Sequence, residues 1–130
     1  MKIRNYILLT AIILLSSVNL LAQEPKTKLD STSLYFEVTE HDFGTIKKGT
    51  DAFYNFSYTN NSKKPLIINN VETSCGCTTP FWSKKPMRTG EYDEISVIYD
   101  TDKLGVFHKT ITVTSNIRTV VLTIKGVVIE

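Results

Sequence analysis

The chain has 130 residues, of which 42% are hydrophobic and 22% are charged. Its 15 Lys and Arg residues nearly balance its 13 Asp and Glu residues, so the sequence lacks the strong positive charge of a nucleic-acid-binding domain. The length suits a single domain.

The first residues indicate export. Lys2 and Arg4 precede an almost wholly apolar run from Ile7 to Leu21, and Ala22 offers a small residue for cleavage. This is the pattern of a secretory signal peptide. Because the run is shorter than the roughly 20 residues that a membrane span needs, we interpret residues 1–22 as a cleaved signal peptide. An uncleaved N-terminal anchor is the alternative.

Cleavage would give a neutral chain in the periplasm or outside the cell. Both basic residues of the signal segment are lost with it, which leaves equal numbers of basic and acidic residues. Residues 23–33 are polar and lack periodicity, so we expect a flexible spacer before a domain at 34–130. No later apolar stretch is long enough to span a membrane, so we expect no transmembrane segment and no nucleic-acid partner.

From residue 34 onward, apolar and polar residues alternate with the period of two that is typical of β-strands. Turn formers such as Thr89-Gly90 and Ser115-Asn116 separate the segments. We expect about seven short antiparallel strands in an immunoglobulin-like β-sandwich, with a small β-barrel as the alternative. The alternation directs Phe56 to the core and His108 to the solvent. The clearest strands are Leu34–Thr39, Ala52–Thr59, Leu66–Val71, Glu94–Tyr99, Phe107–Thr114 and Val120–Val128.

The two cysteines, Cys75 and Cys77, stand one residue apart around Gly76. In an extended strand their Cβ atoms would lie about 6.5–7 Å apart, whereas a disulfide needs about 3.8 Å. A turn at Gly76, using a positive φ that glycine tolerates, would allow a small and strained bridge that is easy to reduce. We therefore expect the pair at the end of a strand.

Three interpretations of this pair remain open. The cysteines are structural, either bridged or buried as small apolar groups. Alternatively, both thiolates bind a soft metal, for which Cu(I) suits two sulfur ligands better than Zn(II). In the third interpretation they form a redox switch or an intermolecular bridge. His41 is a remote candidate for a third metal ligand.

No other residues indicate chemistry. The sequence has neither a phosphate-binding glycine loop nor a nucleophile elbow, and no spacing ties a serine or aspartate to a histidine. We therefore expect no catalytic residues, no cofactor and no enzyme activity. Phe81 and Trp82 follow the cysteines and are interpreted as a cap over one end of the core, in preference to a binding patch.

Several motifs resemble those of a family of secreted bacterial domains of unknown function. They are "HDFGTIKKG", "YTNNSKKPLIINNVETSCGCTTP", "TGEYDEISVIYDT", "GVFHKTITVTSN" and "TIKGVV", and the SCGCT box is the mark of that family. The resemblance covers about residues 35–129 and implies kinship with PapD-like, major-sperm-protein and ASH domains of immunoglobulin-like fold. Thr89-Gly90 departs from the usual Pro-Gly. The family implies a fold and an envelope location, and it supplies no established activity.

These observations favour a non-enzymatic, exported interaction module. Its partner would be an unknown envelope protein, bound by pairing with an edge strand of the sandwich. The alternative is a thiol site at Cys75 and Cys77 for a soft metal, Cu or Zn, or for redox chemistry.

Overall fold

The computed structural model describes residues 34–130, so the predicted signal peptide (1–22) and spacer (23–33) lie outside the described residues. Eight strands and no helix form within this part of the chain. None of these residues offers a helix that is long and apolar enough to cross a membrane. The strands are β1 (Leu34–Phe36), β2 (Glu40–Lys47), β3 (Ala52–Asn60), β4 (Ile68–Thr73), β5 (Thr78–Phe81), β6 (Tyr92–Tyr99), β7 (Gly105–Ser115) and β8 (Thr119–Ile129).

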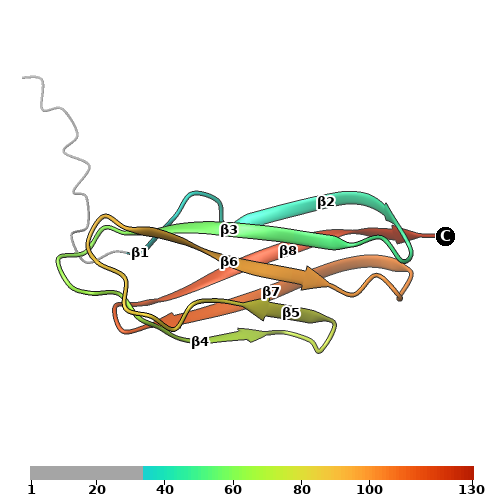
Figure 1. Ribbon diagram of the computed structural model, residues 1–130. Coiled ribbons are helices and arrows are strands. Elements are labelled where there is room, and N and C mark those ends of the chain that lie inside the picture. The colour runs from blue at the N-terminus through green and yellow to red at the C-terminus, as the bar shows by residue number, and fades with distance from the viewer. Residues whose placement is uncertain (1–33) are drawn as a thin grey trace, which may run out of the picture.

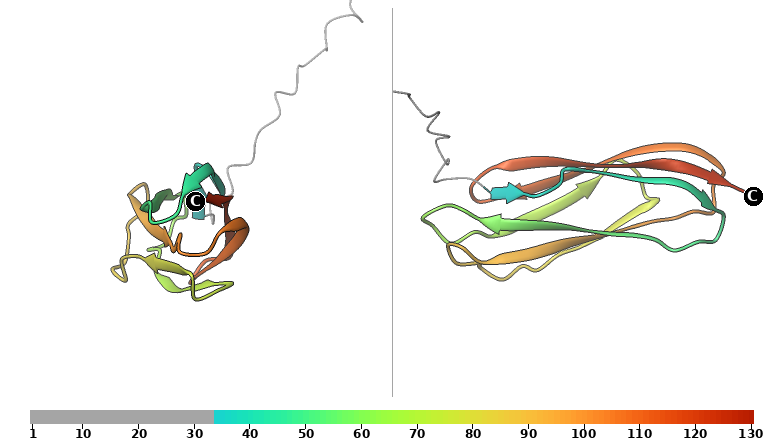
Figure 2. Two further views of the ribbon diagram at one scale, coloured as in Figure 1. Left: turned by 90° about the vertical axis from the view of Figure 1, so that its right-hand side faces the viewer. Right: turned by 90° about the horizontal axis from the view of Figure 1, so that it is seen from above.

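The strands form two sheets of four, packed face to face into an elongated sandwich (Figures 1 and 2). The order is β1-β3-β6-β5 in the first sheet, called sheet A here, and β2-β8-β7-β4 in the second, called sheet B. The predicted all-β, immunoglobulin-like sandwich is therefore confirmed. β1 begins at one end of the long axis, and the C-terminus lies at the other (Figure 1).

Two strands differ from the expectation. The segment predicted as one strand at Leu34–Thr39 ends at Phe36, and the chain then crosses to sheet B, where β2 pairs with β8 in parallel. The sequence analysis had predicted antiparallel strands throughout, and the β2–β8 pair is an exception. β5 is the other unpredicted strand, and it brings the total to eight.

The core lies between the sheets and follows the predicted alternation. Phe56 is fully buried, as expected for β3, and His108 lies exposed on the outer face of β7. The ring of Phe107 stacks on Tyr99 with 3.8 Å between centroids. Gly126 of β8 makes room for this ring, because a Cβ there would lie 2.8 Å from its Cζ.

A buried asparagine joins the loops at the end of the sandwich where β1 begins. The Asn60 side chain donates to the carbonyls of Lys64 (2.8 Å) and Met87 (2.9 Å). Its oxygen accepts from the amide (2.9 Å) and the hydroxyl (2.7 Å) of Ser62. A fully satisfied buried amide fixes both loops in place.

Candidate functional site

The cysteine pair lies in the corner that leads from β4 in sheet B to β5 in sheet A. A disulfide joins Cys75 to Cys77, whose Cα atoms lie 5.3 Å apart. Both cysteines are half-buried, and Gly76 between them is exposed. Cys77 packs against the hydrophobic core. The corner lies in the half of the molecule that carries the C-terminus, short of that end (Figure 1).

The corner backbone is also held by bonds that do not involve sulfur. The Ser74 amide donates to the Thr110 carbonyl at 3.0 Å, and the Asp100 amide donates to the Cys77 carbonyl at 2.8 Å. The Thr73 hydroxyl lies within hydrogen-bonding distance of the Cys75 carbonyl at 2.8 Å. These contacts tie the corner to both sheets, so its path does not depend on the disulfide alone.

Gly76 does not adopt the left-handed conformation expected from the sequence. The glycines with positive φ are Gly44, Gly49, Gly90 and Gly105. A Cβ at Gly76 would meet nothing within 4 Å. The corner therefore forms with ordinary backbone angles at this residue, and the glycine leaves its outer surface open.

The structure does not bring His41 to the cysteines. Its ring stacks on Tyr54 with 3.7 Å between centroids, and Phe43 meets it edge-on at 4.5 Å. Burial lowers the pKa of His41 below 6.5, although the charge of Asp42 acts in the opposite direction. Among residues 34–130, no group of three or more His, Cys, Asp or Glu side chains could hold a metal ion. Metal binding at Cys75 and Cys77 stays a prediction, and it requires the disulfide to open first.

Trp82 and Phe81 differ in their exposure to solvent. Trp82 packs against the core, and Lys84 Nζ lies 5.7 Å from its ring centroid. Its indole nitrogen is buried without a hydrogen-bond partner among the described residues. Phe81 is 55% exposed, so the predicted cap consists of Trp82 without Phe81.

Three of the four sheet edges are protected against pairing with another strand. β1 has three residues, and β2 carries charged side chains and a register shift between Asp42 and Thr45. In β5, Cys77 directs its carbonyl to β6, so Thr78 and Pro80 direct their backbone groups outward. Pro80 has no amide donor, and the Thr78 carbonyl faces the Thr73 hydroxyl at 3.2 Å. Short length, charge, bulges and proline are recognised protections of sheet edges.

β4 is an open edge, although it too has a register shift, between Ile68 and Asn70. The Ser74 amide points to β7, so the alternation along an extended chain directs the amide and carbonyl groups of Val71 and Thr73 away from β7. No backbone hydrogen bond joins these groups to any other residue within 34–130. β4 contains no proline and no lysine, and its one charged residue, Glu72, accepts from Asn70 at 2.9 Å.

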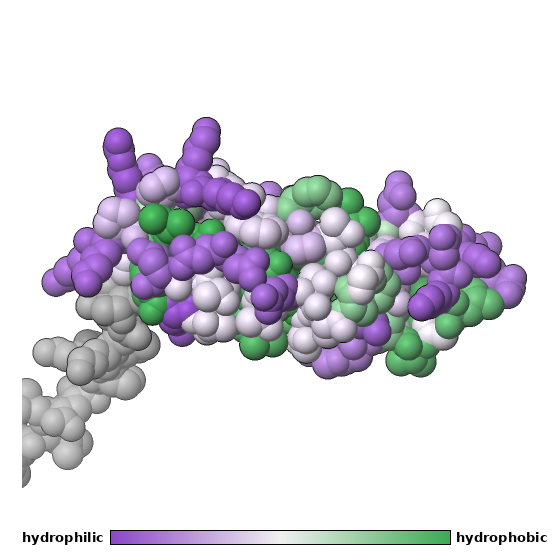
Figure 3. Space-filling model, turned by 90° about the horizontal axis from the view of Figure 1, so that it is seen from below, coloured by the Kyte–Doolittle hydropathy of each residue, from purple (hydrophilic) through white to green (hydrophobic). Residues whose placement is uncertain are grey.

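The side of the sandwich that carries β4 and β5 is closed at both of its ends. The cysteine corner closes one end, and the other is closed by paired backbone bonds between Leu66 and Met87, both 2.8 Å. Figure 3 views the molecule from this side: strongly hydrophilic residues gather toward the two ends, and most of the middle is weakly polar or apolar. An extended segment could approach β4 here without meeting a dense cluster of charges.

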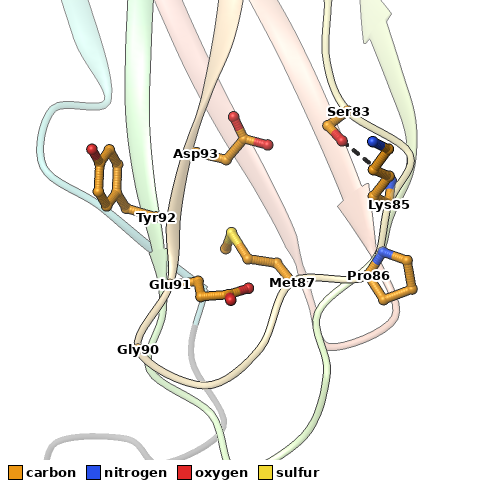
Figure 4. Close-up of a pocket in the computed structure, with 8 residues that line it drawn as sticks. All are labelled: Ser83, Lys85, Pro86, Met87, Gly90, Glu91, Tyr92 and Asp93. Atoms are coloured by element: carbon orange, nitrogen blue, oxygen red, sulfur yellow. Dashed lines mark hydrogen bonds between the residues drawn. The ribbon is translucent and has the colours of Figure 1, made fainter.

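A surface hollow of about 620 Å³ lies beside the loop from β5 to β6 (Figure 4), and neither cysteine lines it. Lys85, Glu91 and Asp93 contribute charged groups to its lining, and Met87 and Tyr92 also line it. The Glu91 carboxylate accepts from the Arg88 amide at 2.7 Å. No nucleophile is paired with a base in this hollow, so its geometry indicates no reaction.

Sequence reasoning missed what several of the family-like motifs do. Asn60 of "YTNNS" joins two loops, and Asn116 of "TSN" accepts from the Ile67 amide and donates to the Pro65 carbonyl at 2.8 and 2.9 Å. Gly126 of "TIKGVV" accommodates Phe107. These motif residues build the fold, and asparagines beside turn signals were the available clue.

Comparisons with known proteins agree with this geometry. Residues 34–128 match the sequence model of a family described as "Protein of unknown function (DUF1573)". No curated protein matches the chain.

Solved structures of similar fold include the ASH/PapD-like domain 7 of human CEP192. It aligns with a TM-score of 0.66 at 14% identity, covering 88% of this chain and 96% of that domain. A protein of unknown function from Porphyromonas gingivalis W83 aligns with a TM-score of 0.64 at 15% identity over 75% of this chain, which spans 48% of that protein. The VesB protease of Vibrio cholerae aligns at 0.55 and 15% identity over 75% of this chain and 32% of the protease. The predicted likeness of fold to PapD-like and ASH domains is confirmed, and at these identities the likeness concerns the fold alone.

Proposed function

The chain belongs to the family of proteins of unknown function DUF1573, whose name assigns no activity, so we propose its function from the edges of its own sheets. It is a non-enzymatic interaction module that binds an extended segment of another exported protein along β4. The free amide and carbonyl groups of Val71 and Thr73 carry this proposal. Pairing of strands at a sheet edge is a general mode of peptide recognition.

The composition of β4 supports the proposal, because the strand lacks the proline and lysine that most strongly discourage pairing at a sheet edge. It instead presents Asn70 and Glu72 on its outer face. The open run is short, so a few backbone bonds would form, and binding would be of the weak, transient class.

An enzyme is less well supported. Among residues 34–130, no nucleophile, base and orienting group come together, and the charged hollow beside the β5–β6 loop lacks such a set. The export pattern at residues 1–22 supports a site of action in the periplasm or outside the cell.

Site-specific photocrosslinking tests the proposal in cells of the source organism. A photoreactive amino acid replaces Asn70 on β4 in one variant and Thr79 on β5 in a matched control, since both residues are exposed. We expect a discrete crosslinked partner from position 70 and none from position 79. The further substitution Val71→Pro removes an outward amide that does not serve the β4–β7 ladder, and it should abolish the crosslink while the protein stays folded by circular dichroism.

Equal crosslinking from both positions would contradict recognition by β4. So would a crosslink at position 70 that survives Val71→Pro, because the partner would then bind the outer face and not the backbone edge. If Val71→Pro fails to fold, Thr73→Pro takes its place, because it removes the other outward amide of β4 and also leaves the β4–β7 ladder intact.

A further inference from the structure

The Cys75–Cys77 disulfide is open to a reagent from solvent. Gly76 is exposed and lacks a side chain that could shield the bridge, and Ser74 before it is exposed as well. Nothing lies within 4 Å of the position that a Cβ of Gly76 would occupy. Both sulfur-bearing residues are only half-buried.

The backbone bonds around the disulfide do not involve its sulfur atoms. The amides of Ser74 and Asp100 hold the corner to β7 and to the end of β6, and the Thr73 hydroxyl lies against the Cys75 carbonyl. The bridge closes a ring between residues only two apart in sequence, so it restrains little of the unfolded chain. We therefore expect the corner to pass between oxidised and reduced forms without unfolding of the sandwich.

The two sulfur atoms have different surroundings. Cys75 Sγ lies 3.6 Å from the hydroxyl of Thr78, which can donate a hydrogen bond to a thiolate at Cys75. Cys77 packs against the hydrophobic core, where a thiolate would be poorly solvated. Cys75 is therefore the better leaving group, and a stabilised leaving thiolate speeds exchange.

From these observations we propose that Cys75 and Cys77 form a thiol–disulfide exchange site, which accepts electrons from a peptide that bears two thiols. The inference does not depend on strand pairing at β4. The attacking thiolate of the peptide bonds to Cys77 Sγ, the Cys75–Cys77 bond breaks, and Cys75 leaves as a thiolate that takes a proton from water. The second peptide thiolate then attacks the peptide sulfur of the mixed disulfide and releases Cys77 as a thiolate, which is protonated in turn. The peptide dithiol loses two electrons and two protons, and the protein disulfide becomes two thiols.

Glutathione is the probe for the first step. The folded, oxidised protein is mixed with reduced glutathione, quenched with an alkylating reagent and mapped by peptide mass spectrometry. We expect the mixed disulfide on Cys77 and the alkyl group on Cys75. Thr78→Val should slow the reaction about tenfold or more, since it removes one hydrogen bond to a charged leaving group. Thr78→Ser should restore the rate, and Thr79→Val on the exposed face of β5 should leave it unchanged.

A reduced two-cysteine peptide under nitrogen is the probe for the complete reaction. One peptide disulfide should form for each protein disulfide lost, with circular dichroism unchanged. The proposal is overturned if the folded protein is not reduced by either probe, if glutathione attaches to Cys75, or if Thr78→Val and Thr79→Val react alike. Should Thr78→Val fail to fold, the attachment site in the unmodified protein decides the question. None of these readouts involves Val71, so failure here is distinguishable from failure of recognition at β4.

Discussion

At the scale of single residues, small side chains occupy positions where the backbone or the core leaves no room. Gly126 faces the ring of Phe107, whose Cζ and Cε1 would lie 2.8 and 2.9 Å from a Cβ at that position. The ring stacks on Tyr99 and cannot turn aside freely. The "TIKGVV" motif is thus explained by packing, although alternation alone shows only that its residues belong to a strand.

Gly126→Ala should destabilise the protein by about 1–3 kcal/mol, because overpacking forces the Phe107 ring or the backbone near Gly44 to move. Gly76→Ala is the matched control, because its Cβ meets nothing within 4 Å, and it should change stability by less than about 0.5 kcal/mol. Urea denaturation measures both. If the two variants were equally stable, the close approach of Phe107 to Gly126 would not limit the core.

The burial of Tyr58 should make the protein less stable at alkaline pH. Burial, followed by the negative charge of Asp93, raises the pKa of Tyr58 from 10.0 to about 12. Because the folded state favours the neutral phenol, the contribution is fully present below pH 10 and is lost as the pH rises toward 12. Tyr58→Phe should flatten the decline in the free energy of unfolding between these values. An undiminished decline in that variant would assign the effect to other groups.

At the scale of elements, the strands that sequence analysis identified are those with a buried face. β3, β6 and β7 alternate clearly because every second residue faces the opposite sheet. β2 was missed because most of its side chains are exposed, and Gly44 at a φ of 65° interrupts it beside the register shift. β5 was missed because it has four residues and contains Pro80, which lowers any strand prediction.

The corner between β4 and β5 could be predicted only in part. The position of Cys75 and Cys77 next to a strand end follows from the distance that a bridge requires. The conformation at Gly76 and the contact with Thr78 could not be predicted, because they depend on how two sheets meet. The same holds for the open edge at β4, which depends on which side of the strand β7 occupies.

The double variant Cys75→Ser/Cys77→Ser should lose no more than about 1.5 kcal/mol relative to the oxidised protein, because the bridge closes a very short loop. Urea denaturation under nitrogen, without added thiol, gives the comparison. A loss of several kcal/mol would mean that the corner depends on the bridge for its path, against the backbone bonds described above.

The reduced protein should bind Cu(I) with about one ion per chain, because two neighbouring thiolates offer the soft ligands that Cu(I) prefers. Titration of the reduced protein against a competing chromophoric ligand measures the stoichiometry, and the double serine variant is the control. Equal Cu(I) binding by both proteins would remove Cys75 and Cys77 from consideration as a metal site.

At the scale of the whole molecule, the fold was predictable because period-two alternation and turn signals recur along the domain. The predicted export of the protein depends on the sequence before β1, where Lys2, Arg4 and the apolar run form the pattern of a signal peptide. The intact mass of the protein extracted from the cell envelope should therefore show loss of about 22 residues. A full-length mass together with membrane retention would favour the uncleaved anchor.

The crossing of the chain from β1 to β2 has a mechanical consequence. β2 and β8 lie side by side and run in the same direction, while β1 begins at one end of the long axis and β8 ends at the other (Figure 1). A force that draws Leu34 and Glu130 apart would pull β2 and β8 past each other along their length. The ladder between them would bear that load in shear, with its hydrogen bonds strained together, and would not open like a zipper one bond after another. A domain tethered through its first strand would thereby resist tension along the long axis of the sandwich.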